Sequence, residues 1–437
     1  MSGNNAEIVA DAVRSVIDWV DEILLIDTGI SDGTVELVKE LAGEKFRQTQ
    51  FAWRNDFALA RNTAFEQAAA HGATWALTID TDERLIVDGF RTLDELRTLL
   101  ASEPEILAWL VVNRDGSYAK ERLVRVPTAL RWKGRTHEAL IGATDRQRKG
   151  LPGVRFFEVA KTPDAFRHKL ERDLVILQEE TRDKPDNARW WYYLGQTLDG
   201  LQRPREAADA YQQCARLDGW AEEAAWACYQ AAKCLSTLKE FRQAIQACAL
   251  GLARQPGSPE LAWLAGFCCF QLGEYRNAMH WEQMAIALGN VEGTKAGETR
   301  IGFRHLPGWY EGPYDVLRFV FQRLGMPDAA RDADEKYKRA SQMRIDHDAS
   351  ASRGGVKLTP LHRAVSPTAN GRKVFFDLGA HHGESIRQLT PQLGLDETWE
   401  IHSFEPNPAC ELARRLSNVD LPIQIHHAAV WVRDGTM

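Results

Sequence analysis

The sequence predicts a multidomain protein in which two α/β segments flank an all-α repeat region. Three observations lead to this prediction. Over residues 1–165, short apolar runs that end in acidic residues alternate with helical patterns, as in a parallel sheet covered by helices. Alanines then recur at a helical-repeat period within residues 166–345. After a polar linker over residues 346–372, a strand followed by a glycine turn begins at Lys373.

Composition narrows the class of protein. Of the 437 residues, 44% are hydrophobic and 26% are charged, as in ordinary globular domains. The net charge of −7 argues against general nucleic-acid binding, which needs a basic face. The sequence has no apolar run of membrane-spanning length, and its first residues do not resemble a signal peptide. Six of the seven cysteines fall in helical pattern without a C-x-x-C pair, so we expect buried, reduced thiols in a cytoplasmic protein.

Residues 75–83 form the central candidate site. A short apolar run reads as a buried strand, and Asp80 and Asp82 follow it directly. Ligands bind at this end of strands in open α/β sheets, and two carboxylates there can hold a divalent cation that in turn holds a diphosphate. The alternative is that residues 80–83 are only a polar turn. Asp27 ends an earlier predicted strand, residues 22–27, in the same way.

Residues 56–62 supply a second set of candidates. Asp56 is placed to cap a helix, and Arg61 and Asn62 lie about one turn inside it. The alternative is a capped amphipathic helix with an exposed arginine. Two strands are expected at residues 107–112 and 120–126, as an antiparallel pair, and they precede His137 and Glu138.

Taken in order, these motifs resemble glycosyltransferase family 2, in the branch that carries tetratricopeptide repeats. The resemblance implies a Rossmann-like GT-A domain over residues 1–165 and a metal-dependent, inverting transfer from a nucleotide sugar to an acceptor. Five residues would bind the nucleotide sugar: Asp27, Asp56, Arg61, Asn62 and Asp80. Mn²⁺ or Mg²⁺ would be held by Asp80, Asp82 and His137.

The resemblance also implies catalytic roles for Arg61 and Glu138. Arg61 would neutralise the leaving diphosphate, and Glu138 would deprotonate the acceptor hydroxyl. The alternative is that His137 and Glu138 merely shape the acceptor loop. Members of the family begin with an apolar strand that ends where residues 1–5 stand, so we expect the first strand to be missing from this chain. The donor sugar and the acceptor are not encoded in recognisable form.

Residues 166–345 resemble tetratricopeptide repeats. Ala244 and Ala278 are 34 residues apart, which is the period of that repeat, and Ala207 occupies the equivalent position one unit earlier. A further, degenerate helix pair is expected over residues 314–340. Such arrays bind peptides or partner proteins on a concave surface; the alternative here is that they only buttress the catalytic domain or dimerise it.

Residues 373–437 resemble the start of an S-adenosylmethionine-dependent methyltransferase of the FkbM type. The resemblance would place Asp377, Gly379 and Gly383 along the cofactor and Glu405 on its ribose. Because the chain carries only about three strands of this domain, we expect no methyltransferase activity from it. The alternative functions are therefore O-methylation of the same glycan by a full-length form, or a repeat scaffold with inactive catalytic domains.

Overall fold

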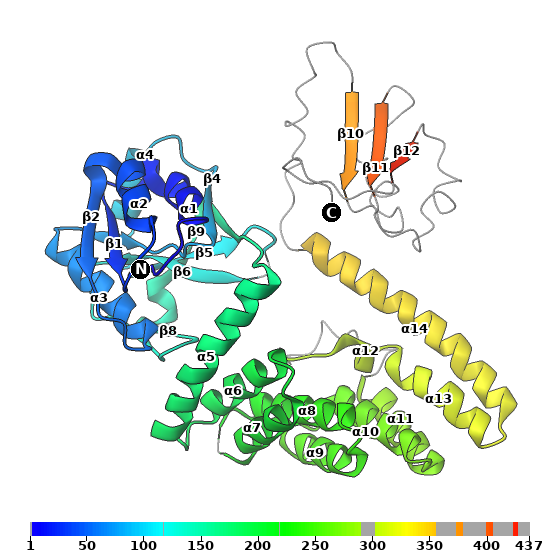
Figure 1. Cartoon of the computed structure of the whole chain (residues 1–437). Coiled ribbons are helices and arrows are strands. Elements are labelled where there is room, and N and C mark those ends of the chain that lie inside the picture. Colours follow the sequence, from blue (N-terminus) through cyan, green and yellow to red (C-terminus); the bar gives the residue numbers. More distant parts are fainter. Residues whose placement is uncertain are drawn as a thin grey trace. The chain divides into compact units, whose positions relative to one another are not determined.

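The computed structural model describes residues 2–116, 118–217, 219–289, 302–354, 373–378, 399–404 and 423–426. The chain forms two compact units, Met1–Val356 and Lys357–Met437 (Figure 1). The division falls inside the expected linker of residues 346–372. The start of that linker is nevertheless helical, because α14 (Pro327–Gly354) continues past Asp346.

The first unit begins with a mixed α/β domain that contains three separate sheets, one five-stranded and two two-stranded. Strands β1 (Ile23–Asp27) and β2 (Phe46–Gln50) pair in parallel. The helices of this part are α1 (Val9–Val16), α2 (Thr34–Ala42) and α3 (Phe57–Ala70). A common apolar core lies between α1, α2 and β1, and its buried side chains are Val9, Val13, Leu25 and Val38. The periodicity of these apolar residues is what predicted the two helices and the strand from sequence.

A five-stranded sheet has the order β3-β6-β5-β9-β4. Its strands are β3 (Trp75–Leu77), β4 (Glu83–Val87), β5 (Ala108–Asn113), β6 (Ala119–Arg125) and β9 (Arg148–Glu158). Strands β5 and β6 are antiparallel, as predicted. The remaining elements are α4 (Leu93–Ser102) and the hairpin of β7 (Arg131–Lys133) and β8 (Ala139–Ile141). Strand β3 ends before Ile79, because the chain turns there and Glu83 already opens β4.

Residues 2–5 join the sheet of β1 to the sheet of β3, near the ends of these two strands. The Ser2 N–H donates to the Ile26 carbonyl at 2.9 Å, and the Thr28 N–H donates to the Ser2 carbonyl at 3.1 Å. Ser2 thereby makes a parallel bridge to Asp27. On the other side, the Thr81 hydroxyl donates to Asn5 Oδ1 at 3.4 Å. The predicted acidic tips of β1 and β3 thus belong to different sheets, and a short extended segment links them.

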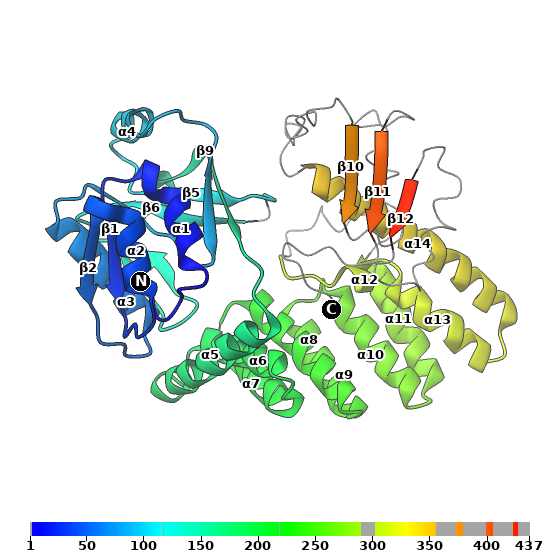
Figure 2. The same cartoon turned by 45° about the horizontal axis from the view of Figure 1, so that its top comes forward.

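The rest of the first unit is an array of helical hairpins (Figure 2). It follows α5 (Pro163–Asp183), which starts slightly before the boundary predicted at residue 166. The array comprises α6 (Ala188–Gly200), α7 (Pro204–Arg216), α8 (Ala221–Thr237), α9 (Phe241–Arg254), α10 (Pro259–Gln271), α11 (Tyr275–Gly289), α12 (Leu306–Trp309), α13 (Gly312–Arg323) and α14. Helices α13 and α14 supply the predicted degenerate pair.

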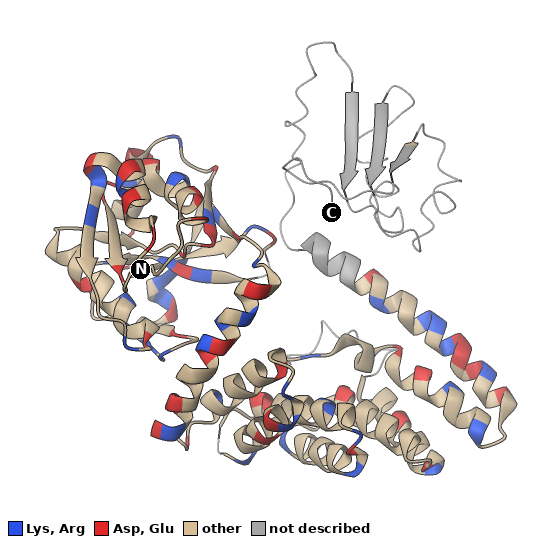
Figure 3. Cartoon of the chain, viewed as in Figure 1, with Lys and Arg blue, Asp and Glu red and all other residues tan. Residues whose placement is uncertain are grey.

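The repeat pattern read from the sequence corresponds to buried helix contacts. Ala207, Ala244 and Ala278 are all fully buried. The six cysteines of the array are buried and free, as expected. Acidic and basic residues are interspersed along the first unit (Figure 3). None of the helices that the structure describes combines the length and the apolar character of a membrane-spanning helix.

The second unit contributes a parallel sheet in the order β10-β11-β12. Its strands are β10 (Lys373–Leu378), β11 (Trp399–Phe404) and β12 (Ile423–His426), which match the three strands expected from sequence. Asp377 lies in β10. Three other candidate cofactor residues, Gly379, Gly383 and Glu405, lie outside the described residues.

One buried acid in the array stands out. Glu282 on α11 is fully buried, and neither of its carboxylate oxygens has a hydrogen-bond partner. It packs on Gly266 of α10, where a Cβ would come within 2.3 Å of Glu282 Oε1. Burial, and to a lesser extent the charge of Asp315, raises the pKa of Glu282 well above its ordinary value. The side chain is therefore carried into the core as the neutral acid.

Replacing this acid should stabilise the protein in a pH-dependent way. The folded state holds a proton on Glu282 that the unfolded state loses above about pH 4.5, so the parent protein loses stability as pH rises from there. We expect Glu282→Met to raise the free energy of unfolding by about 1–3 kcal/mol at pH 8 and by less at pH 5. Urea unfolding at the two pH values measures this. Glu36→Met, on an exposed part of α2, is the matched control. An equal gain at both pH values would contradict the assignment.

Candidate active site

Arg61 lies at the centre of the candidate site. Asp56 caps α3 by accepting the Leu59 N–H at 2.8 Å, which confirms the predicted helix start and places Arg61 one turn into the helix. Arg61 Nε donates to Glu138 Oε1 at 2.6 Å, and Nη2 donates to Asp80 Oδ1 at 2.9 Å. One guanidinium therefore joins the carboxylates of two loops that are far apart in sequence.

Asp80 is held by two arginines. Its second oxygen accepts from Arg122 Nη2 at 3.1 Å, so both carboxylate oxygens are engaged. Burial raises the pKa of Asp80, but the charges of Arg61 and Arg122 outweigh burial and bring the pKa well below its usual range. The side chain still keeps 32% of its surface exposed. Asp80 is thus an ionised carboxylate that faces solvent at the end of β3.

Glu83 stabilises the turn that carries Asp80. It is almost fully buried, forms an ion pair with Arg122, and accepts from Lys120 Nζ at 3.0 Å. Its other oxygen accepts the Asp80 N–H at 3.1 Å. Neither Lys120 nor Arg122 was among the residues predicted from sequence to have a role in the site. The spacing of Lys120 and Arg122 could have predicted that both side chains face the same side of the sheet, because residues two apart on a strand do so.

Asp82 pairs with a lysine. Its carboxylate contacts Lys161, just beyond β9, and its carbonyl accepts the Val159 N–H at 2.7 Å. The described parts of the chain hold no group of three or more His, Cys, Asp or Glu side chains that could bind a metal ion. Asp80, Asp82 and His137 are therefore not assembled into the three-residue metal site that the sequence predicted.

His137 fails to join that set because the helical array holds it elsewhere. Its ring stacks on Tyr193 of α6, with ring centroids 3.9 Å apart and the planes within 2° of parallel. Partial burial, and next the charge of Lys169, lower the pKa of His137 to about 4. The lowered pKa leaves the imidazole neutral at pH 7, although the residue reaches the protein surface.

Further contacts fix the loop of residues 134–138 against α5 and α6. Arg135 Nη2 lies 2.7 Å from Asp183 Oδ2, and Arg135 Nη1 lies 3.1 Å from Glu179 Oε2. Gly134 has a φ of +103°, and a Cβ there would approach Trp190 to 2.7 Å, so the position requires glycine. The next residue after His137 is Glu138. The helices α5 and α6 thus fix the loop that carries Glu138, one of the two carboxylate partners of Arg61.

Two other predicted site residues have structural partners in the fold. Both oxygens of Asp27 are engaged: they accept the N–H groups of Gly29 and Ile30 and the amides of Gln48 and Gln50. The bond from Ile30 is the main reason why the pKa of Asp27 is low. Asn62 bonds both backbone groups of Trp132, at 2.9 and 3.0 Å. A nucleotide contact by either side chain stays a prediction.

Comparison with known proteins identifies the first part of this arrangement. Residues 3–94 match the family model described as glycosyl transferase family 2. The N-terminal part of the chain contains a glycosyltransferase family 2 domain. The matched segment includes Arg61, Asp80 and Asp82 and ends before β5, so Arg122 and Glu138 lie beyond it.

Similar proteins include both repeat proteins and glycosyltransferases. A TPR repeat-containing protein of Synechococcus elongatus is 32% identical over 214 residues, which cover 45% of this chain and 50% of that protein. The SPbeta prophage-derived glycosyltransferase SunS of Bacillus subtilis is 23% identical over 223 residues, or 47% of this chain and 50% of that protein. This chain spans about half the length of these two relatives.

A third relative covers less of the chain. The lipopolysaccharide core biosynthesis glycosyltransferase LpsC of Rhizobium meliloti is 38% identical over 96 residues, which are 21% of this chain and 33% of that protein. Among solved structures, the crystal structure of MamA aligns with 44% of this chain and 99% of its own, at 15% identity and a TM-score of 0.32.

Removing the central guanidinium should destabilise the domain. Arg61→Ala leaves the carboxylates of Asp80 and Glu138 without their shared partner, and breaking a buried ion pair in this way costs about 3 kcal/mol. The free energy of unfolding in urea measures the loss. Arg14→Ala, which removes an exposed pair with Asp11, should change stability by less than about 1 kcal/mol. Equal effects of the two substitutions would show that Arg61 is not a structural centre.

The stack on Tyr193 should control the titration of His137. Tyr193→Ala removes the ring that covers one face of the imidazole, so the pKa of His137 should rise from about 4 toward the ordinary value of 6.5. NMR titration of the histidine ring carbons measures it, with His137→Asn to assign the resonance. Tyr275→Ala on α11 is the control and should leave this pKa unchanged. An unaltered pKa in Tyr193→Ala would exclude the proposed covering of the ring.

Proposed function

We propose that the N-terminal domain transfers a sugar from a nucleotide sugar to a nucleophilic group of an acceptor, with inversion at the anomeric carbon. The observation that carries this proposal is the placement of Arg61 between Glu138 and Asp80. This places a cation and two carboxylates together at the end of a β-strand, where α/β domains bind ligands. The family 2 match and the similarity to two glycosyltransferases support it.

The charged residues suit the requirements of this reaction. Negative charge grows on the departing nucleoside diphosphate, and preorganised cations stabilise it. Arg61 and Arg122 supply such cations beside Asp80. In the proposed step, Glu138 takes the proton of an acceptor hydroxyl as its oxygen attacks the anomeric carbon. The bond to the diphosphate breaks at the same time, and its electron pair leaves with the diphosphate oxygen.

The residues fit a divalent cation at Asp82 better than at Asp80. Both Asp80 oxygens already accept from arginines, whereas the Asp82 carboxylate contacts the ammonium of a partly exposed lysine, Lys161. The Lys161 ammonium is a cation in direct contact with the Asp82 carboxylate, which is where a metal ion bound by Asp82 would also lie. When bound there, Mn²⁺ or Mg²⁺ would supply positive charge for the diphosphate. His137 has no part in this proposal.

The proposal makes Asp82 essential for turnover. We expect Asp82→Ala to lower the release of nucleoside diphosphate by roughly 10²-fold, because one group that stabilises the departing charge is lost. The assay uses a panel of UDP-, GDP- and dTDP-sugars with Mn²⁺ or Mg²⁺. Asp94→Ala removes an exposed acid on α4 and is the matched control. Equal turnover in Asp82→Ala and the parent chain would contradict the proposed role.

A further inference from the structure

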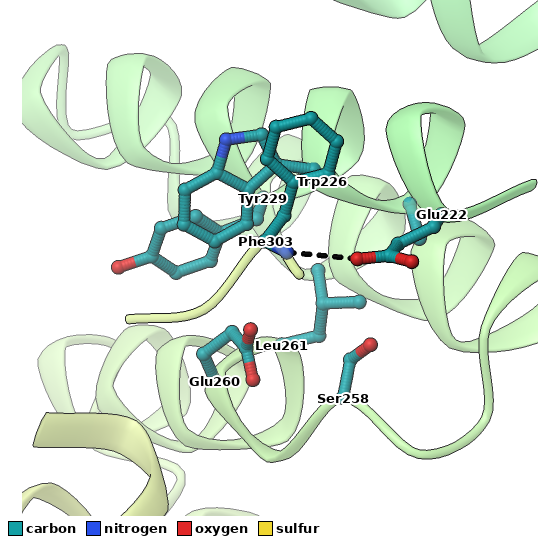
Figure 4. A pocket seen from close by; sticks show the side chains of 8 residues that line it. Glu222, Trp226, Tyr229, Ser258, Glu260, Leu261 and Phe303 are labelled. Carbon is teal, nitrogen blue, oxygen red and sulfur yellow. Dashed lines mark hydrogen bonds between the residues drawn. The ribbon is translucent and has the colours of Figure 1, made fainter. Parts of the chain in front are cut away.

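The helical array contains an aromatic groove that a segment of the same chain occupies. The groove lies between α8 and α10, which are the first helices of two successive hairpins (Figure 4). Trp226 and Tyr229 line it from α8, and Glu260 lines it from α10. Residues 302–305, which precede α12, run across it. These residues are not part of any helix, and His305 has an extended backbone.

Two side chains of the segment, two residues apart, stack on tryptophans of α8 and α10. The Phe303 ring stacks on Trp226 at 5.9 Å between centroids and 12° between planes, and it also lies 5.3 Å from Trp220. His305 stacks on Trp263 of α10 at 5.4 Å and 9°. This alternate placement is how an extended peptide presents its side chains to a binding surface.

The backbone of the segment is also recognised. The Phe303 N–H donates to Glu222 Oε1 at 2.8 Å, and the Gly302 N–H donates to the same oxygen. Figure 4 shows the Phe303 nitrogen facing this carboxylate. A side-chain carboxylate that binds main-chain N–H groups does not depend on the identity of the bound residues. The groove therefore combines a sequence-independent contact with two aromatic contacts.

Charge adds a third element of recognition. Glu260 is almost fully buried, and its Oε2 has no hydrogen-bond partner. Arg304 Nη1 is likewise buried without a partner. Arg304 stands between the two aromatic residues in sequence, and its positive charge acts on Glu260, which with Glu222 is one of the two acids that line the groove. The polar fit of the segment is incomplete, as expected of an occupant that a better ligand can replace.

We propose that this groove is a binding site for an extended polypeptide with an aromatic residue followed by a basic one, and that residues 302–305 occupy it as an internal competitor. This site is separate from the proposed sugar transfer and does not depend on it. A tethered competitor acts at a high effective concentration, so it weakens binding from solution without any change of fold.

The test uses a fluorescent, N-acetylated peptide that copies residues 302–306, Gly-Phe-Arg-His-Leu. Phe303→Ala empties the aromatic site, so we expect this variant to bind the peptide at least about tenfold more tightly than the parent chain in fluorescence anisotropy. A peptide with alanine in place of phenylalanine should bind neither protein. The double variant Phe303→Ala/Trp226→Ala should lose the gain, because the ring that stacks on phenylalanine is gone.

A matched substitution controls for loosening of the fold. Phe319→Ala removes an exposed phenylalanine of α13 and should leave peptide binding at the parent level. Equal binding by Phe303→Ala and Phe319→Ala would overturn the proposal.

Hydrogen exchange tests the unaltered chain, independently of whether any variant folds. Millimolar peptide should speed exchange at the Phe303 amide several-fold, because displacement removes its bond to Glu222. Unchanged exchange at saturating peptide would also overturn the proposal.

Discussion

The contact between Arg61 and two carboxylates is the interaction on which the candidate site depends. Arg61 is only 13% exposed, and an arginine cannot lose its proton at that depth to escape the cost of burial. The charge of Arg61 helps to keep Asp80 ionised, and Glu138 places a second carboxylate beside the same guanidinium. This set of contacts links α3, the turn after β3 and the loop after β7, and it continues through Arg122 to Glu83. The charges that suit a diphosphate are thus also the charges that hold the domain together.

The sequence predicted those features that depend on local pattern. Apolar periodicity gave the strands around Leu25 and Ala108, and the Asp56 cap located the start of α3. The spacing of Ala244 and Ala278 gave the hairpin array. The local sequence pattern could not show that β1 and β3 lie in separate sheets, because the residues of a strand do not indicate which distant strand it pairs with.

The candidate site shows the same limit. Arg61, Asp80 and Glu138 were named from motifs, and the structure brings their side chains together. The partners Arg122 and Lys161 come from strands or loops far along the chain, and only the fold reveals which carboxylate each one neutralises. The metal role predicted for His137 came from its position beside Glu138 in sequence, whereas in space its ring stacks on Tyr193; a metal role for His137 stays a prediction.

The close approach of Gly134 to Trp190 has a consequence for how this protein can be divided. The boundary suggested by the sequence lies near the start of α5. A cut there would remove the helices that Gly134, Arg135 and His137 contact, and would release the loop that carries Glu138. The smallest segment that keeps these contacts of the candidate site therefore extends through α6. A chimera that exchanges repeat arrays between relatives should keep this first helical layer with the α/β domain and place its junction after it.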